Sequence, residues 1–102
     1  AVVSSATIPI MEAIRNRRLL AFDYRGGARV IEPHTYGLDK WKREVVCGYQ
    51  VEGDSSSGKP KGWRTFVIAD AANIRAEARH FAEPRPEYRR DDGAFAQIIA
   101  QL

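Results

Sequence analysis

Two arginines inside strand-like apolar segments are the side chains of this chain best suited to binding chemistry. Arg29 follows a turn of paired glycines, and Arg64 lies in a Trp-Arg-Thr-Phe run. A guanidinium group presents a planar fork of N–H donors that matches a phosphate or a carboxylate. If both side chains reach one open hollow, the pair predicts a site that binds an anion and carries out no reaction.

Aromatic residues near the two arginines extend the predicted site. Tyr24 and Tyr49 could stack a base, which is worth about 1 to 3 kcal/mol per base, or bond a phosphate through their hydroxyls. His34 and Tyr36 follow Pro33 and could line the opening of the same predicted binding site. The predicted ligand- and anion-binding residues are therefore Arg29, Arg64, Tyr24, Tyr49, His34 and Tyr36.

Each of these assignments has a structural alternative. An arginine on a strand can pair with a neighbouring carboxylate, such as Glu32 or Glu44, and then serves only the fold. A tyrosine in an apolar strand is often a core residue whose hydroxyl has a partner. The sequence leaves these alternatives open.

Patterns typical of enzymes are incomplete in this chain. Gly53–Lys59 fits most of a phosphate-binding loop, but Pro60 occupies the position of the metal-binding hydroxyl, and no helix is expected to follow. Cys47 lies in mid-strand without a base near it in sequence. His34 and His80 are too few for a metal site. We therefore expect no enzymatic activity, no metal and no cofactor.

Composition indicates one globular domain over residues 1–102, with 44% hydrophobic and 28% charged residues. The net charge is +3, and twelve of the sixteen basic residues are arginines, which favours an anionic partner such as a single-stranded nucleic acid or a nucleotide. No apolar stretch approaches the roughly 18 residues that cross a bilayer, so we expect no membrane partner. The single cysteine, Cys47, fits a reducing cytoplasmic compartment.

The hydrophobic pattern predicts a mainly β fold with flanking helices. Thr7, Pro9 and Glu12 indicate a helix over about residues 8–18, with the Thr7 hydroxyl at its start. Alternating apolar and polar residues then predict five strands within residues 19–81. These strands are Leu19–Tyr24, Arg29–Ile31 with a bend at Pro33, Glu44–Val51, Trp63–Ile68 and Ile74–Phe81, the last with a helix as the alternative.

Three connections between these strands have distinct compositions. Arg25–Ala28 contains paired glycines and predicts a tight turn. Asp39–Arg43 mixes Trp41 with basic residues, which suits either an exposed nucleic-acid contact or a hairpin tip with a partly buried tryptophan. Gly53–Gly62 is a polar loop rich in serine.

The C-terminal part divides into a connector and a predicted helix. Two prolines mark residues 82–90 as extended. Asp91 or Asp92 could then cap a helix over about residues 91–102, with an apolar stripe at Phe95, Ile98, Ile99 and Leu102. This stripe packs on the barrel or against a second chain. An assembly module, acting through the barrel edges or this helix as a homo-oligomer or with a partner protein, is therefore the alternative function.

Over about Ile10–Phe81 the chain resembles the WYL domain family of bacterial proteins. The resemblance rests on Ala13-Ile14, Tyr24, Arg29 with Pro33, Gly48-Tyr49, and Arg64-Thr65-Phe66 followed by Ile68 and Ile74. Glu44-Val45-Val46 replaces the Trp-Tyr-Leu run that names the family, and Asp70 stands where an arginine is often found. The signature motif is therefore degenerate.

The resemblance implies a small five-stranded barrel of the Sm-like or SH3-like type. WYL domains usually follow a helix-turn-helix in transcription regulators or accompany defence proteins, where they sense a ligand, often a nucleic acid or nucleotide. No helix-turn-helix is evident here, so the chain is similar to the short stand-alone members. Arg29 and Arg64 keep the family's basic character at their positions and carry over as its contact residues.

Overall fold

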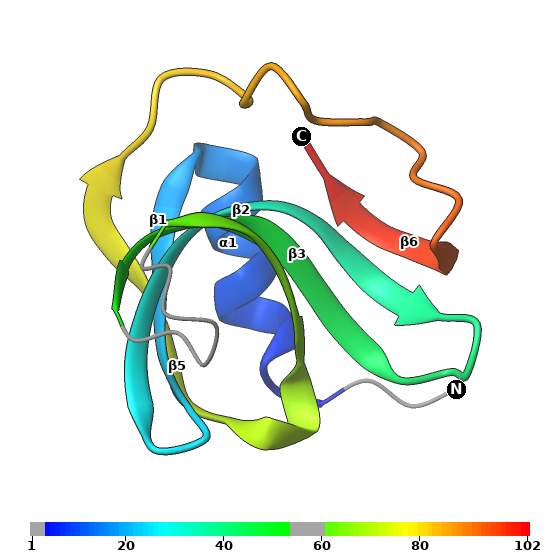
Figure 1. Ribbon diagram of the computed structural model, residues 1–102, viewed down its shortest axis with the longest axis horizontal. Coiled ribbons are helices and arrows are strands. Elements are labelled where there is room, and N and C mark those ends of the chain that lie inside the picture. The colour runs from blue at the N-terminus through cyan, green and yellow to red at the C-terminus, as the bar shows by residue number, and fades with distance from the viewer. Residues whose placement is uncertain (1–3, 54–60) are drawn as a thin grey trace.

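The computed structural model describes residues 4–53 and 61–102, which form a mainly β fold with a helix near the N-terminus (Figure 1). The mainly β class and the N-terminal helix are therefore confirmed. The predicted loop Gly53–Gly62 falls largely on residues 54–60, outside the described residues. The elements are α1 (Thr7–Asn16), β1 (Arg18–Tyr24), β2 (Gly27–Asp39), β3 (Glu44–Gly53), β4 (Gly62–Val67), the 3-10 turn η1 (Ile68–Asp70), β5 (Ala71–His80) and β6 (Phe95–Gln101).

The helix α1 starts close to the predicted position, but its cap differs. The residue before the helix is Ala6, which provides no side-chain cap, whereas the Thr7 hydroxyl lies 2.6 Å from that of Tyr36. The helix ends two residues earlier than predicted because Arg17 adopts a left-handed conformation with φ of 52°. Arg18 can then begin β1 directly.

A tight turn connects β1 to β2, as the paired glycines predict. Tyr24 pairs with Gly27, so only two residues form the loop. Arg25 and Gly26 both have positive φ, 50° and 83°, which is the arrangement of a type I′ hairpin turn. This turn brings Arg29 across from Phe22.

Strand β2 is much longer than predicted and continues through Pro33. One of its edges pairs with β3 from Arg29 to Leu38. The other edge pairs first with β1, up to Ile31, and then with β6, from Thr35 onward. Pro33 lies between these two partners and beside a register shift toward β3, so its missing amide is tolerated there.

The predicted closed barrel is wrong, because the sheet is open. Hydrogen-bonded strands follow the order β4-β3-β2-β1-β5, with β6 added beside β2, and this path does not close among the described residues. The six-residue strand β4 turns through η1 directly into β5, so these two strands meet end to end. Closure would require them to lie side by side. The β5 segment itself is a strand, so the helical alternative there is wrong.

The predicted C-terminal helix is also wrong, since Phe95–Gln101 forms strand β6. The connector before it contains bends and a turn in which the Tyr88 amide donates to the Arg85 carbonyl, and Figure 1 shows it running across the top of the molecule from β5 to β6. Asp92 caps a turn rather than a helix, because its carboxylate accepts the Ala94 amide. The free half of β2 offers unpaired backbone groups, and β-branched Ile98 and Ile99 suit a strand that satisfies them.

The core lies between α1 and the curved sheet. Helix α1 packs against β1, β2, β5 and β6 and contributes Ile10, Ala13 and Ile14 to the buried cluster. The sheet contributes Leu20, Phe22, Tyr24, Ile31, Tyr36, Val46 and Phe66, and the turn η1 adds Ile68. We call the side of the sheet that carries these residues the inner face, and the opposite side the outer face. None of the helices in the described part of the chain has the length and apolar character needed to span a membrane.

Candidate functional site

Arg29 and Arg64 lie on the inner face of the sheet. Antiparallel partners project to the same side of a sheet, and Arg29 is the partner of the core residue Phe22. Arg64 lies two residues before the core residue Phe66 on β4, so it projects to that side as well. The two predicted cations therefore share a face.

The guanidinium group of Arg29 lies among aromatic rings. Its Cζ atom is 5.6 Å from the centre of the Tyr24 ring and 5.8 Å from that of Phe66. Nη1 donates a long hydrogen bond of 3.4 Å to the Gln50 side chain, and the buried Nε has no hydrogen-bond partner among the described residues. A buried N–H group without a partner costs about 1 to 3 kcal/mol, so this arrangement lowers the stability of the fold.

Gln50 lies on β3, between the strands that carry Arg29 and Arg64. The partner of Gln50 on β4 is Gly62, and Arg64 folds back over this glycine. A Cβ atom on Gly62 would lie 3.0 Å from Nη1 of Arg64, and φ at this glycine is +141°. The two side chains therefore reach toward neighbouring positions, Arg29 toward Gln50 and Arg64 toward Gly62. Arg64 Nη1 also donates to the Trp63 carbonyl at 2.9 Å.

Tyr24 lies beside Arg29 but is mainly a core residue. Its ring packs edge-to-face against Phe22 and Phe66, and its hydroxyl accepts the Val67 amide at 3.3 Å. The exposed Arg25 guanidinium lies 5.3 Å from the ring centre. The Tyr24 ring therefore makes cation–π contacts with both Arg25 and Arg29.

Tyr36 is on the inner face but belongs to a different environment. It is fully buried, and its hydroxyl donates to the Glu44 carboxylate while it lies 2.6 Å from the Thr7 hydroxyl. Burial, together with the Glu44 carboxylate, raises the pKa of Tyr36 far above its ordinary value. The residue ties the start of α1 to the start of β3, and it does not join Arg29.

Tyr49 lies on the outer face, away from the two arginines. Its cross-strand partners are Glu32 on β2 and Trp63 on β4, and its ring meets that of Trp63 edge-to-face. Arg85 from the connector lies 3.9 Å from the Tyr49 ring centre and forms two hydrogen bonds with the Glu32 carboxylate, at 2.8 and 3.1 Å. These contacts fasten the connector to the sheet.

His34 is a second outer-face residue that the structure separates from Arg29. It is completely buried, with rings of Trp63, Phe81 and Tyr88 within 6 Å of its own. Nε2 accepts the Arg85 amide at 3.1 Å, so Nδ1 carries the proton and donates to the Glu32 carbonyl at 2.7 Å. Burial lowers the pKa of this imidazole, which keeps the ring neutral.

Sequence reasoning missed Gln50 and Arg85. Gln50 is a polar residue at an inward position of an apolar strand, and this break in the pattern was an available signal. Arg85 lies between two prolines in the connector, and nothing local indicates that it reaches Glu32, fifty-three positions away. The six predicted residues therefore divide between two faces, and Arg29, Arg64 and Tyr24 remain together.

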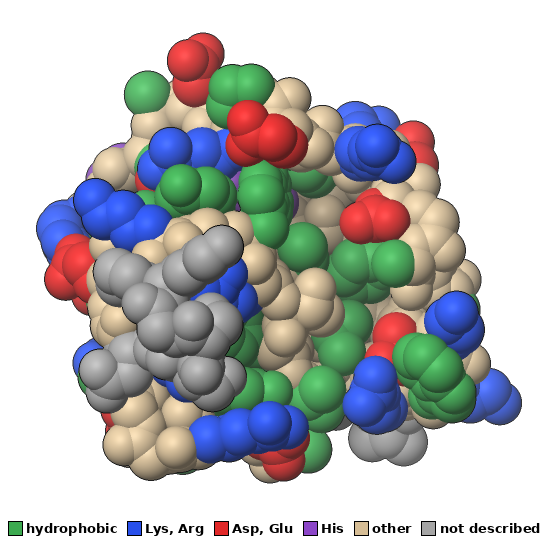
Figure 2. Space-filling model, in the orientation of Figure 1, with side chains coloured by type: hydrophobic (Ala, Val, Ile, Leu, Met, Phe, Trp, Pro, Cys, Tyr) green, Lys and Arg blue, Asp and Glu red, His purple; other side chains and the backbone are tan. Residues whose placement is uncertain are grey.

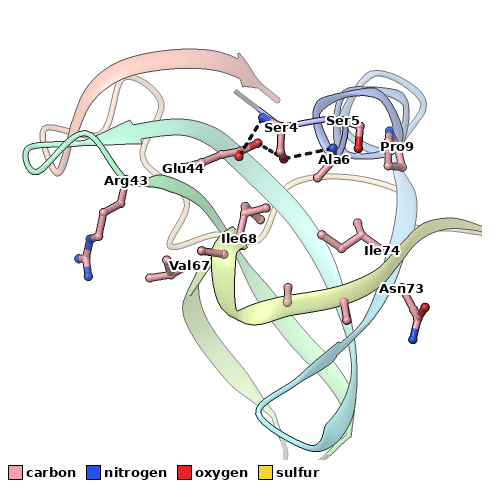
Figure 3. Close-up of a pocket in the computed structure, with 13 residues that line it drawn as sticks. Ser4, Ser5, Ala6, Pro9, Arg43, Glu44, Val67, Ile68, Asn73 and Ile74 are labelled. Atoms are coloured by element: carbon pink, nitrogen blue, oxygen red, sulfur yellow. Dashed lines mark hydrogen bonds between the residues drawn. The ribbon is translucent and has the colours of Figure 1, made fainter. Parts of the chain in front are cut away.

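A groove of about 580 Å³ opens between the segment before α1 and the start of β5 (Figure 3). Ser4 donates through both its amide and its hydroxyl to Glu44 at one side of the groove, and Ile68 and Ile74 lie near its middle. Ser4 and Glu44 thus bond each other. The nearby Arg43 is paired with Asp39 at 2.8 Å.

Other reactive side chains are not grouped. Burial raises the pKa of the Cys47 thiol, with a smaller opposing effect from the Thr65 hydroxyl, so this cysteine is less often ionised than an exposed one. Within residues 4–53 and 61–102, no three His, Cys, Asp or Glu side chains are placed to hold a metal ion.

Comparisons with known proteins identify no relative. No family model matches the chain, no curated protein matches it, and no solved structure matches its fold. The similarity to WYL domains therefore stays a prediction from the motifs.

Proposed function

We propose that this protein is a non-catalytic regulatory domain of the WYL type that binds a nucleic acid or nucleotide-like anion on its inner face. Arg29 and Arg64 contact the phosphate, and Tyr24 supports the bound group from below. Gln50 orients Arg29. The single cysteine fits a cytoplasmic setting for such a sensor.

The observation that carries the proposal is the absence of a carboxylate beside Arg29 in the described part of the chain. The two acidic residues that could have neutralised it are engaged elsewhere, because Glu32 pairs with Arg85 and Glu44 bonds Ser4 and Tyr36. A part-buried guanidinium group set against aromatic rings suits a phosphate that brings its own negative charge.

The test is a titration of fluorescently labelled cyclic nucleotides and short oligonucleotides at low salt, followed by anisotropy. Charge-assisted hydrogen bonds contribute about 1.5 to 3 kcal/mol, so Arg29→Ala should weaken binding about tenfold to a hundredfold. Arg29→Ala combined with Arg64→Ala should abolish it. Binding should also weaken steadily as salt rises, because phosphate contacts release counterions.

Arg75→Ala is the matched control, because Arg75 is an exposed arginine on β5 whose partner Ala21 is not on the inner face. It removes the same charge and should leave affinity within about twofold, since distant surface charges act weakly. Saturable binding that survives loss of both Arg29 and Arg64 would contradict the proposal. So would the lack of any saturable signal at low salt.

Assembly through sheet edges stays the alternative prediction. Its helical version no longer applies, because residues 95–101 form a strand that pairs with β2. The open sheet leaves β5 at one end of the strand order, but this strand carries Arg75, Glu77 and Arg79. Charged residues on an edge strand oppose pairing with another chain, so we favour the binding function.

A further inference from the structure

The β2–β3 hairpin carries a tryptophan in an unusual place. Trp41 is 66% exposed at the tip of the hairpin, where an indole ring gains nothing from burial. In Figure 2, Lys and Arg side chains surround a hydrophobic patch over this hairpin, at the lower right. A shallow hollow of about 430 Å³ lies beside the ring and is lined by Trp41 and Arg43.

Basic side chains lie against the tryptophan ring. Lys40 Nζ is 5.0 Å from the ring centre, and Arg43 Cζ is 5.1 Å from it. Lys42 completes the tip, so three cations meet one carboxylate, that of Asp39, within five residues. The tip therefore carries an excess of positive charge around an exposed aromatic surface.

The tip has one defined shape, which Asp39 imposes. Its carboxylate accepts the amides of Trp41 and Arg43, both at 2.9 Å, and the Arg43 Nε at 2.8 Å. The backbone closes with two further bonds between Asp39 and residues Lys42 and Arg43. Lys42 takes a left-handed conformation with φ of 63°. The ring is thus presented on a rigid turn, which lowers the entropy lost on binding.

We propose that the hairpin tip is a binding site for single-stranded nucleic acid, distinct from the inner face. A base stacks on Trp41, and the flanking phosphates bind Lys40 and Lys42. Base stacking on an aromatic ring is stronger than an exposed cation–π contact, so the base displaces Lys40 from the ring. Arg43 stays in place because Asp39 holds it. The tip and Arg29 lie at opposite ends of β2.

The test compares a labelled thymidine 15-mer with an abasic strand of the same length and backbone, by anisotropy at low salt. The wild-type protein should bind the 15-mer about 5- to 150-fold more tightly than the abasic strand, which is the effect of stacking one base. Trp41→Ala should remove this difference, and Trp41→Phe should retain most of it. Because the ring is exposed, these substitutions should not impair folding, which a thermal melt verifies.

The cations are tested by the salt dependence of binding. Lys40→Ala combined with Lys42→Ala should reduce the slope of log affinity against log salt by about 1.4, since each phosphate contact on a single strand contributes about 0.7. The matched control removes two exposed arginines elsewhere, by Arg15→Ala and Arg89→Ala. This control should leave the slope unchanged.

Three outcomes would overturn the proposal. The wild-type protein could bind the abasic strand as tightly as the 15-mer, Trp41→Ala could preserve the base effect, or polyglutamate could compete as well as the 15-mer, which would identify an acidic protein as the partner. The result is independent of the inner face: Arg29→Ala should weaken nucleotide binding and leave the effect of the base at Trp41 intact. If nucleotide binding does not depend on Arg29, the inner-face proposal fails. If the effect of the base does not depend on Trp41, the hairpin-tip proposal fails.

Discussion

Arg29 and Arg85 show how the surroundings decide what one residue type does. Arg85 is neutralised by Glu32 and rests on the Tyr49 ring, so its guanidinium group serves to hold the connector. Arg29 rests on similar rings but has no such carboxylate among the described residues, and one of its donors is unused. The sequence shows both arginines and both acids, but it does not show which of them meet.

His34 gives a prediction at the level of one residue. The fold keeps its ring neutral through burial and through the amide of Arg85, so the pKa of His34 in the folded protein lies below its ordinary value of 6.5. As pH falls below about 6.5, the unfolded chain takes up a proton that the folded protein does not, and the free energy of unfolding should therefore fall. Above this pH, His34 should contribute no pH dependence.

Urea denaturation at pH 7.5, 6.5 and 5.5 measures this effect. His34→Gln should show a smaller loss of stability between pH 6.5 and 5.5 than the wild-type protein, although it starts from a lower value. The control is His80→Gln, at an exposed position, which should leave the loss that depends on His34 in place. If wild-type stability and His34→Gln stability change in parallel with pH, the assignment of a neutral His34 is wrong.

At the level of elements, the contact between β2 and β6 depends on a glycine. Gly37 pairs with Ile98, and a Cβ atom at this position would lie 2.0 Å from the Gln97 carbonyl oxygen. Gly37→Ala should therefore push β6 away from β2 and lower the free energy of unfolding by about 1 to 3 kcal/mol. Hydrogen exchange should become faster at residues 95–101.

Gly93→Ala is the matched control, since nothing lies within 4 Å of the added methyl group. It should leave both stability and exchange in β6 close to those of the wild-type protein. Equal behaviour of the two alanine variants would mean that β6 does not pack against Gly37 as described.

Several elements could be predicted from the sequence because their signals are local. Alternation identified β1, β3 and β4, and the glycines identified the β1–β2 turn. The C-terminal segment was misassigned because its apolar residues fit a helical stripe, while the unpaired half of β2 that attracts it is remote in sequence. Pro33 was likewise predicted to bend the strand. It is tolerated inside β2 because it lies between the part that pairs with β1 and the part that pairs with β6, and local sequence does not show this arrangement.

At the level of the whole molecule, stability depends on the packing of α1 against the sheet. Ile10 is completely buried in this contact, whereas Ile8 on the same helix is 74% exposed. Ile10→Ala should lower the free energy of unfolding by about 2 to 5 kcal/mol, a large part of the stability expected for a domain of this size. Ile8→Ala should change it by less than about 0.5 kcal/mol.

Denaturation followed by far-ultraviolet circular dichroism and by tryptophan fluorescence measures this difference. The two signals should give the same midpoint in each variant, because the helix and the sheet share one core. A loss in Ile8→Ala as large as that in Ile10→Ala would show that α1 is not seated as described.

The candidate site could be predicted only in part, because the face on which a side chain lies depends on the register of the strands. Arg29, Arg64 and Tyr24 share the inner face, as the alternation of strands suggests. Tyr49 lies on the outer face because it alternates with the inward Gln50, and His34 lies there because it is five residues after the inward Arg29. Tyr36, seven residues after Arg29, returns to the inner face because of the irregularity after Pro33. A one-residue shift reverses the side on which a residue projects, and sequence spacing does not determine it.

The sharing of one β2 edge by two strands has a consequence for synthesis on the ribosome. Strand β1 precedes β2 in the chain, so the first half of that edge can pair as soon as β2 has emerged. The second half waits for residues 95–101, more than fifty residues later. During this interval the nascent chain displays an open edge, which is the kind of surface that chaperones protect from association with other chains.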